Sequence, residues 1–291
     1  MRARTLACRS SRIRKWWGER RREAEPGDGD RREENARLIA KALGTFVMKR
    51  ELVVRELCSL ILAQCHDHPL RVAFDGVDAA GKTTLANEVE LGLISSGRQI
   101  IRASIDGFHN PKAIRHRDLS PRGYFADSFN HSMLIESLLL PLGPNGSRHF
   151  RRAGFDFLTD SRIEAQLEIA AEDAILLFDG VFLLREELRD FWDFSVFVEA
   201  SFENTVARAE ARDQYLFGDA AAVRRCYAER YVPGQELYLQ SVDPARLADM
   251  IIDNNDIAAP VLRKVPNPSF QRTPIGGAPS SAASVAAELK R

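Results

Sequence analysis

Residues 76–84 contain the complete pattern G-x-x-x-x-G-K-[ST], which predicts a loop that binds the phosphates of a nucleotide. A short apolar run at 71–75 predicts a strand before the loop, and 82–95 predict a helix after it. The glycines let backbone N–H groups point at phosphate oxygens, and the helix adds the positive end of its dipole. We therefore expect a nucleoside triphosphate to bind at Gly76, Asp78, Ala79, Ala80, Gly81, Lys82, Thr83 and Thr84.

Two side chains of this loop carry specific chemistry. The Lys82 ammonium can reach the β- and γ-phosphates, and the Thr83 hydroxyl can bind Mg²⁺. The sequence therefore predicts ATP and Mg²⁺ as the nucleotide and the metal. We also expect the loop to face solvent, so that removing the Lys82 ammonium would leave the fold intact.

The rest of the pattern predicts an α/β fold, a P-loop NTPase-type parallel sheet with helices on both faces and a small helical lid. Residues 174–178 form a continuous apolar run, which is typical of a strand that is buried on both faces. Further strands are expected at 100–105, 194–198 and 250–252, the last of which closes the pattern. Helices are expected at 51–64, 132–140, 202–215 and 221–239, the last interrupted at Pro233.

These elements place the folded domain at residues 50–262. The segment 1–49 begins with a basic stretch and has no apolar period, so we expect a disordered leader. A transit peptide or a nucleic-acid-binding arm is the alternative. A chain that starts at Met48 should therefore fold and keep full activity. Residues 263–291 are rich in Pro, Ser, Ala and Gly and are expected to form a disordered tail.

Composition narrows the function further. Lys+Arg and Asp+Glu both number 41, and this balance argues against a dedicated nucleic-acid-binding domain. No apolar run approaches the roughly 18 residues that a membrane span needs. The cysteines at 8, 58, 65 and 226 are scattered and form no CxxC pair, which favours a reducing, cytoplasmic location. His66 and His68 are interpreted as surface residues because an i,i+2 pair is poorly placed for a metal.

The residues around the phosphate loop distinguish three kinds of phosphate-loop protein. A GTPase would carry an N-K-x-D motif, which the chain lacks. A motor-type ATPase would end its second phosphate-side strand in Asp-Glu, but here Asp179 is followed by Gly180. A small-molecule kinase is therefore favoured.

An ordered series of motifs over about residues 70–256 resembles the uridine kinase family and its pantothenate kinase and phosphoribulokinase relatives. The series consists of the phosphate loop, Ser104-Ile105-Asp106-Gly107-Phe108-His109, Tyr124, Asp127-Ser128-Phe129-Asn130, Phe155-Asp156-Phe157-Leu158-Thr159-Asp160-Ser161-Arg162, Asp179-Gly180-Val181-Phe182, Arg208 with Arg212-Asp213, and Ala248-Asp249-Met250-Ile251-Ile252. The resemblance implies transfer of the ATP γ-phosphate to a hydroxyl of a nucleoside or a similar small molecule. The alternatives are a nucleotide-binding regulator of the same fold and a kinase for pantothenate or a sugar phosphate.

Asp106 follows a predicted buried strand, which we expect to lie next to the strand before the phosphate loop. It would face the carboxyl edge of the sheet and, as the resemblance implies, accept the proton of the acceptor hydroxyl. Asp127 and Asp160 are the next candidates for that base. Asp179 ends another buried strand at the same edge and would hold Mg²⁺ with Thr83.

The resemblance gives Arg212 a catalytic role and Arg208 a nucleotide-binding role. The two are i,i+4 on one predicted helix, so their guanidinium groups share a face and suit phosphate oxygens. The simpler alternative is a solvated charged face with Glu203 and Glu210.

The acceptor pocket departs from the family pattern. The residues that the resemblance assigns to it are Asp106, His109, Tyr124, Asn130, Phe155 and Asp160. Asn130 stands where the family has an Asp that holds the ribose hydroxyls, and Asp160 replaces a His that contacts the base. Such exchanges can change the substrate, so the acceptor stays open. The expected partners are ATP and a small-molecule acceptor, without nucleic acid or membrane, and a homo-oligomer is left open.

Overall fold

The computed structural model describes residues 50–264. The predicted leader and nearly all of the predicted tail lie outside the described residues. In the described part, six strands form one sheet in the order β10-β9-β8-β1-β7-β2. Their bounds are β1 Leu70–Gly76, β2 Ile100–Ser104, β7 Ile175–Asp179, β8 Phe194–Glu199, β9 Met250–Asp253 and β10 Val261–Lys264. The neighbouring pairs from β9 to β2 are parallel, and only β10 pairs antiparallel with its neighbour. The predicted α/β class is therefore confirmed.

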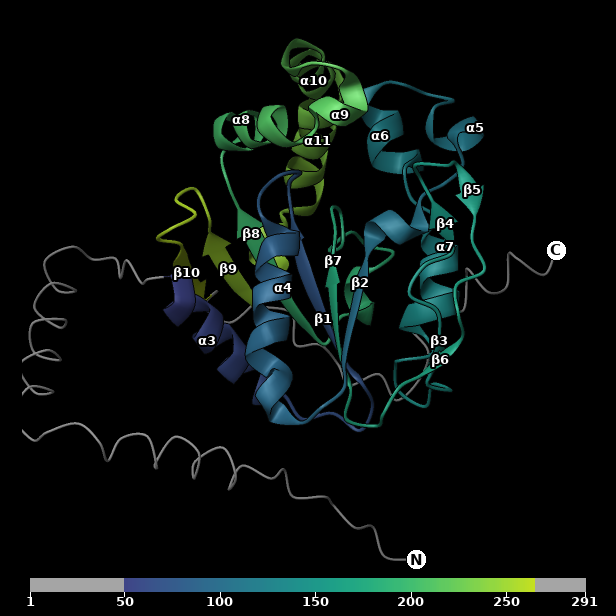
Figure 1. Ribbon diagram of the computed structural model, residues 1–291, viewed down its shortest axis with the longest axis vertical. Helices are drawn as coiled ribbons and strands as arrows, with labels where there is room; N and C mark the ends of the chain where they lie inside the picture. The colour runs from purple at the N-terminus through teal and green to yellow at the C-terminus, as the bar shows by residue number, and fades with distance from the viewer. Residues whose placement is uncertain (1–49, 265–291) are drawn as a thin grey trace, which may run out of the picture.

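The sheet separates two apolar cores because successive strand residues point to opposite faces. In β1, Val72 and Phe74 face one core and Ala73 faces the other. The first core is covered by α3 (Arg50–Leu62) and α4 (Lys82–Leu93), which lie side by side on the sheet in Figure 1. Helices thus cover both faces, as predicted.

The second core is built from shorter pieces, including the long loop after β7 and the helix α11. The elements outside the main sheet on this side of the molecule or next to it are α5 Lys112–Arg115, α6 Pro121–Asp127, α7 His131–Leu134, β3 His149–Phe150, β4 Phe155–Asp156, β5 Ser161–Arg162, β6 Glu168–Ile169, α11 Val232–Val242 and α12 Pro244–Leu247. β3 pairs with β6 and β4 with β5, each antiparallel over two residues. No helix of the described part is long and apolar enough to cross a membrane.

The predicted lid consists of α8 (Phe202–Arg212), α9 (Gln214–Phe217) and α10 (Ala220–Cys226), which Figure 1 shows grouped above the sheet. They share a small core of Ala209, Val223 and Tyr227. Ser201 and Asp219 begin α8 and α10 by accepting hydrogen bonds from backbone N–H groups of the first turn.

Four sequence predictions need correction. The predicted helix 202–215 ends at Arg212, because Asp213 terminates it and α9 follows. The predicted interruption at Pro233 is a π-helical turn at Tyr227–Tyr231; Pro233 itself lies in the first turn of α11, where its missing N–H costs nothing.

The sheet supplies the other two corrections. β9 is not the last strand, because β10 follows it and runs past the predicted domain boundary at residue 262. β2 does not neighbour β1, because β7 lies between them. The strand that leads to Asp106 is thus second from the phosphate loop, and the strand that ends at Asp179 is the direct neighbour.

Candidate active site

The phosphate loop connects β1 to α4, and its two outer glycines have conformations that other residues rarely adopt. Gly76 has φ +150°, and a Cβ there would come within 2.3 Å of the Val198 carbonyl oxygen. Gly81 has φ +98°, and a Cβ there would come within 2.5 Å of the Asn254 side chain. The loop can approach β8 and the end of β9 only because both residues are glycine.

The Lys82 side chain is buried inside this loop and is only 7% exposed. Its ammonium donates a hydrogen bond of 2.7 Å to the Val77 carbonyl oxygen. Burial lowers the pKa of Lys82, and this effect outweighs the attraction of nearby carboxylates, chiefly Asp78 and Asp75. The prediction that Lys82 belongs to a solvent-facing loop is therefore wrong for its side chain.

Thr83 and Asp179 meet, as expected for a shared metal. The Thr83 hydroxyl donates to one Asp179 oxygen at 2.6 Å, and the Arg102 guanidinium donates to the other at 2.7 Å. A hydroxyl and a carboxylate are hard oxygen ligands of the kind that Mg²⁺ prefers, so this pair fits the metal. Arg102 was missed from the sequence, although it lies two residues before the end of β2.

Asp75, directly before Gly76, is fully buried and was also missed. Its carboxylate accepts hydrogen bonds from the N–H groups of Gly76 and Leu183 and from the Tyr238 hydroxyl of α11. Burial, the largest effect, raises the pKa of Asp75 to about 6. Tyr238 therefore ties α11 to the base of the phosphate loop.

Asp78 makes a second connection to the same helix. Its N–H donates to the Gln235 side-chain oxygen at 2.7 Å, and the Gln235 amide donates back to the carboxylate at 3.0 Å. The Tyr124 hydroxyl, from α6, donates to that same carboxylate oxygen at 2.7 Å. Burial raises the pKa of Asp78, whereas Lys82 opposes the rise. Tyr124, predicted on the acceptor side, thus lies against the phosphate loop.

Asp106 lies in a short 3₁₀ turn after β2, Ile105–Phe108, and its side chain is 64% exposed. Its carboxylate is 3.5 Å from Nε2 of His109. The His109 ring packs against Phe129 and Phe157, with ring centroids 4.6 and 5.2 Å away. The two residues predicted from one motif therefore lie together, and Asp106 keeps the exposure that a base for a bound substrate requires.

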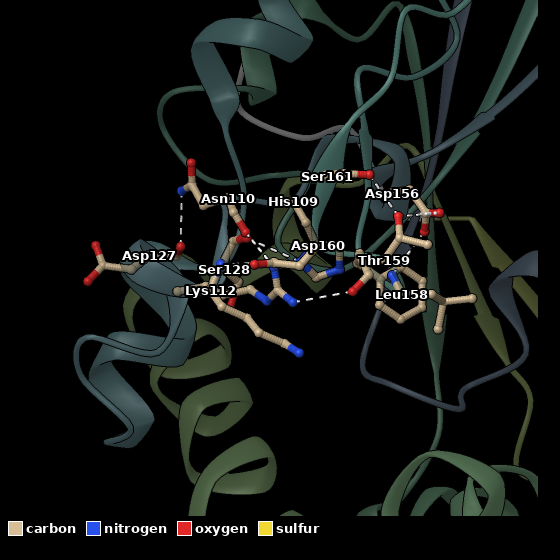
Figure 2. A network of polar contacts seen from close by, with 12 residues as sticks. His109, Asn110, Lys112, Asp127, Ser128, Asp156, Leu158, Thr159, Asp160 and Ser161 are labelled. Carbon is tan, nitrogen blue, oxygen red and sulfur yellow. Dashed lines mark hydrogen bonds and ion pairs between the residues drawn. The ribbon is translucent and has the colours of Figure 1, made fainter.

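Three other predicted acceptor residues have local structural partners. Asn130 begins α7, and its side-chain oxygen accepts from the Met133 N–H at 2.9 Å. Phe155 is buried beneath the Arg115 guanidinium, which lies 5.9 Å from its ring centroid. Asp160 accepts from the Lys112 N–H and from Arg115, as part of the network that Figure 2 shows beside His109.

The two lid arginines also have partners in the protein. Arg212 forms two hydrogen bonds with the neighbouring Asp213, which raise its pKa, and its side chain remains 61% exposed. Arg208 donates to the backbone oxygens of Asn254 and Asn255 at 2.8 and 2.9 Å. Asn254 in turn donates to the Ala80 carbonyl oxygen of the phosphate loop at 2.7 Å. Arg208 is thus connected to the loop through Asn254, and Arg212 interacts electrostatically with Asp78 of the loop while it is bonded to Asp213.

At the opposite edge of the sheet, His66, His68 and Asp193 bring one ligand atom each to within 4.8 Å of one another. His68 is buried, so its interpretation as a surface residue is wrong. Arg71 hydrogen-bonds to both carboxylate oxygens of Asp193. A cation there would have to compete with a guanidinium group, and the cluster adds nothing to the predicted site.

The sequence is similar to those of known kinases. No family model matches the sequence. The chain is 26% identical over 200 residues to a uridine kinase of Lactobacillus johnsonii, covering 67% of this chain and 92% of the relative. It is 25% identical over 180 residues to a pantothenate kinase of Shewanella putrefaciens, covering 55% of this chain and 56% of the relative.

Among solved structures, a possible uridine kinase from Bacillus stearothermophilus has the same fold, with a TM-score of 0.55 and 22% identity. The match covers 68% of this chain and 96% of that one. The relatives confirm the resemblance to uridine kinase-like P-loop kinases that the motifs predicted. Their names differ in the acceptor, and they leave the acceptor of this chain open.

Proposed function

We propose that this protein is an ATP-dependent kinase that moves the γ-phosphate of ATP to a hydroxyl of a nucleoside or a similar small molecule. The observation that carries the proposal is the complete phosphate loop with Lys82 inside it and with Thr83 hydrogen-bonded to Asp179. We further propose that residues 50–264 are the catalytic unit and that it works in the cytoplasm.

Each side chain has a defined part in this reaction. The acceptor hydroxyl attacks the γ-phosphorus, the bond to the ADP oxygen breaks, and Asp106 takes the hydroxyl proton. Lys82 neutralises charge on the phosphates, and Arg212 would stabilise the transferring group after leaving Asp213. Mg²⁺, held by Thr83 and Asp179, would neutralise charge on the β- and γ-phosphates when bound.

Acceptors other than uridine are included because two of the predicted acceptor-binding residues already have hydrogen-bond partners within the protein. The side-chain oxygen of Asn130 caps the N-terminus of α7, and Asp160 is paired with Arg115. The family positions for ribose and base are thus engaged within the protein, which favours a broad screen that includes pantothenate and sugar phosphates.

The test is transfer of labelled γ-phosphate from ATP by purified protein to nucleosides, pantothenate and sugar phosphates. We expect transfer to one class, and a Lys82→Ala variant should transfer about 10²–10³-fold more slowly. Arg246→Ala, which removes an exposed positive charge on α12, is the matched control. Transfer by Lys82→Ala at the wild-type rate, or ATP binding without transfer to any acceptor, would contradict the kinase and favour the regulator.

A further inference from the structure

Three carboxylates surround the phosphate loop, and they differ in how their oxygens are used. Both oxygens of Asp75 and both oxygens of Asp179 accept hydrogen bonds. In Asp78, Oδ2 accepts from Tyr124 and from Gln235, and no donor in the described part of the chain reaches Oδ1. Asp78 therefore offers one acceptor oxygen that the protein itself does not use.

The backbone N–H of Asp78 is also engaged within the protein. Its N–H is bonded to Gln235, so this group of the loop is not free to bind a phosphate oxygen. The partners of Asp78 come from α6 and α11, which pack against one another. The residue thus connects the phosphate loop to α6 and α11.

The Asp78 carboxylate lies among the charged groups of the site. Asp78 and Asp106 act on one another as like charges, whereas Lys82 and Arg212 attract the Asp78 carboxylate. A phosphate oxygen at Asp78 would meet a carboxylate of the same sign, whereas a hydroxyl could donate a hydrogen bond to it. Hydrogen bonds to a charged acceptor are stronger than those between neutral groups.

The residue that the family resemblance assigns to the acceptor hydroxyls cannot serve in the same way here. At position 130 the carboxylate is replaced by an amide, and the amide oxygen is bonded to the Met133 N–H. Among the predicted site residues, Asp78 provides a carboxylate oxygen that this position lacks.

We propose that Oδ1 of Asp78 accepts a hydrogen bond from a hydroxyl of the acceptor molecule, so that Asp78 is an acceptor-binding residue and not a nucleotide-binding one. The acceptor therefore carries a second hydroxyl near the one that is phosphorylated. This inference rests on the proposed kinase function. Tyr124 and Gln235 are positioning residues that hold the carboxylate by its other oxygen.

Asp78→Asn tests the inference with little change of shape. The asparagine oxygen can still accept from Tyr124 and Gln235, and an NH₂ group replaces the free oxygen. We use uridine, pantothenate and ribose 5-phosphate as probes, and take the one that wild type phosphorylates with the highest kcat/KM. Its KM should rise about 10- to 100-fold, while the Kd of a non-hydrolysable ATP analogue changes less than about threefold.

Two further measurements separate a contact from a structural effect. Analogues of the probe that each lack one hydroxyl should show one whose loss costs wild type about 10- to 100-fold and costs Asp78→Asn nothing more. Gln235→Ala, which loosens Asp78 without changing its charge, should raise the acceptor KM by a smaller factor. Asp243→Asn, the same change at an exposed position beyond α11, is the control.

An unchanged acceptor KM, or equal weakening of acceptor and ATP-analogue binding, would overturn the inference while leaving the kinase in place. A fall in kcat alone would also overturn it, because Asp78 would then act on the chemical step. Absence of transfer by wild type to every probe would overturn the proposed function and this inference with it.

Discussion

Asp106 is the residue on which the proposed chemistry depends most directly. Asp106→Asn keeps the shape of the side chain and removes its basicity, so kcat should fall about 10²–10⁴-fold. ATP affinity should change much less, because the phosphate loop supplies most of the triphosphate contacts. Parallel measurement of kcat and ATP binding separates the two roles. An unchanged kcat would remove Asp106 from the mechanism, and lost ATP binding with a modest change in kcat would make it a metal ligand.

Asp75 provides a test at the same scale that needs no substrate. Its pKa is raised from 3.8 to about 6, so the native state retains the proton to a higher pH than the unfolded chain does. The stability that the protonated group contributes is full below about pH 3.8 and is lost as the pH rises to about 6. The largest loss is about 3 kcal/mol.

We therefore expect the unfolding free energy of Asp75→Asn, which does not titrate at this position, to increase relative to that of wild type as the pH rises. Between about pH 4.5 and about pH 7, the difference in unfolding free energy should move toward the variant by about 2 kcal/mol. Urea denaturation across this range measures it, with Asp243→Asn as a control that should follow wild type. Parallel curves for Asp75→Asn and wild type would contradict the shifted pKa.

At the scale of elements, the sequence predicted those that bury a continuous or periodic apolar face. Strands β1, β7 and β8 were found within a residue or two because both of their faces are buried. The two-residue strands β4 and β5 were missed because such short pairings leave no period to read. Strand order was also beyond the sequence, since long-range pairing alone places β7 between β1 and β2.

In the candidate site, too, local sequence features could be predicted and long-range contacts could not. Lys82, Thr83 and Asp179 could be predicted because a local motif or a strand end identifies them. Their long-range partners could not, since Gln235 and Tyr238 reach Asp78 and Asp75 across 157 and 163 positions of sequence. Tertiary packing alone decides which face of α11 meets the loop.

The first residue of helix α3 reaches the region of the phosphate loop. Arg50 bonds to Glu88 of α4 and to the Asn254 side chain, which itself holds the Ala80 carbonyl oxygen. A chain that starts at Met48 retains Arg50 and should match the full chain in melting temperature and turnover. Arg50→Ala should lower stability by about 1–2 kcal/mol, because it removes hydrogen bonds from a charged group.

Thermal unfolding of the full chain, the Met48 form and Arg50→Ala provides the measurement. Arg55→Ala, on the same helix, is the matched control, since no hydrogen bond or ion pair of its side chain is found within residues 50–264. A large loss of stability on removing residues 1–47 would show that the leader belongs to the folded unit.

At the scale of the whole molecule, the phosphate loop lies where the two cores meet. Val77 and Ala80 of the loop belong to the core under α3 and α4, whereas Tyr124 and Tyr238, which bond to the loop carboxylates, belong to the other. A ligand held by the loop therefore acts on both cores and on the helices that cover them. The described part should respond to that ligand as one unit.

MgATP should accordingly raise the midpoint of a single unfolding transition. A ligand that binds only the native state stabilises it by RT ln(1 + [L]/Kd), or about 2.7 kcal/mol at 100 times Kd. Calorimetry of wild type with and without MgATP measures the shift, and EDTA should reduce it because it removes the metal that we propose for Thr83 and Asp179. Lys82→Ala should show little shift at the same concentration. Two separate transitions, of which only one moves with MgATP, would show that the loop is coupled to one core and that the hydrogen bonds from α6 and α11 do not join the two.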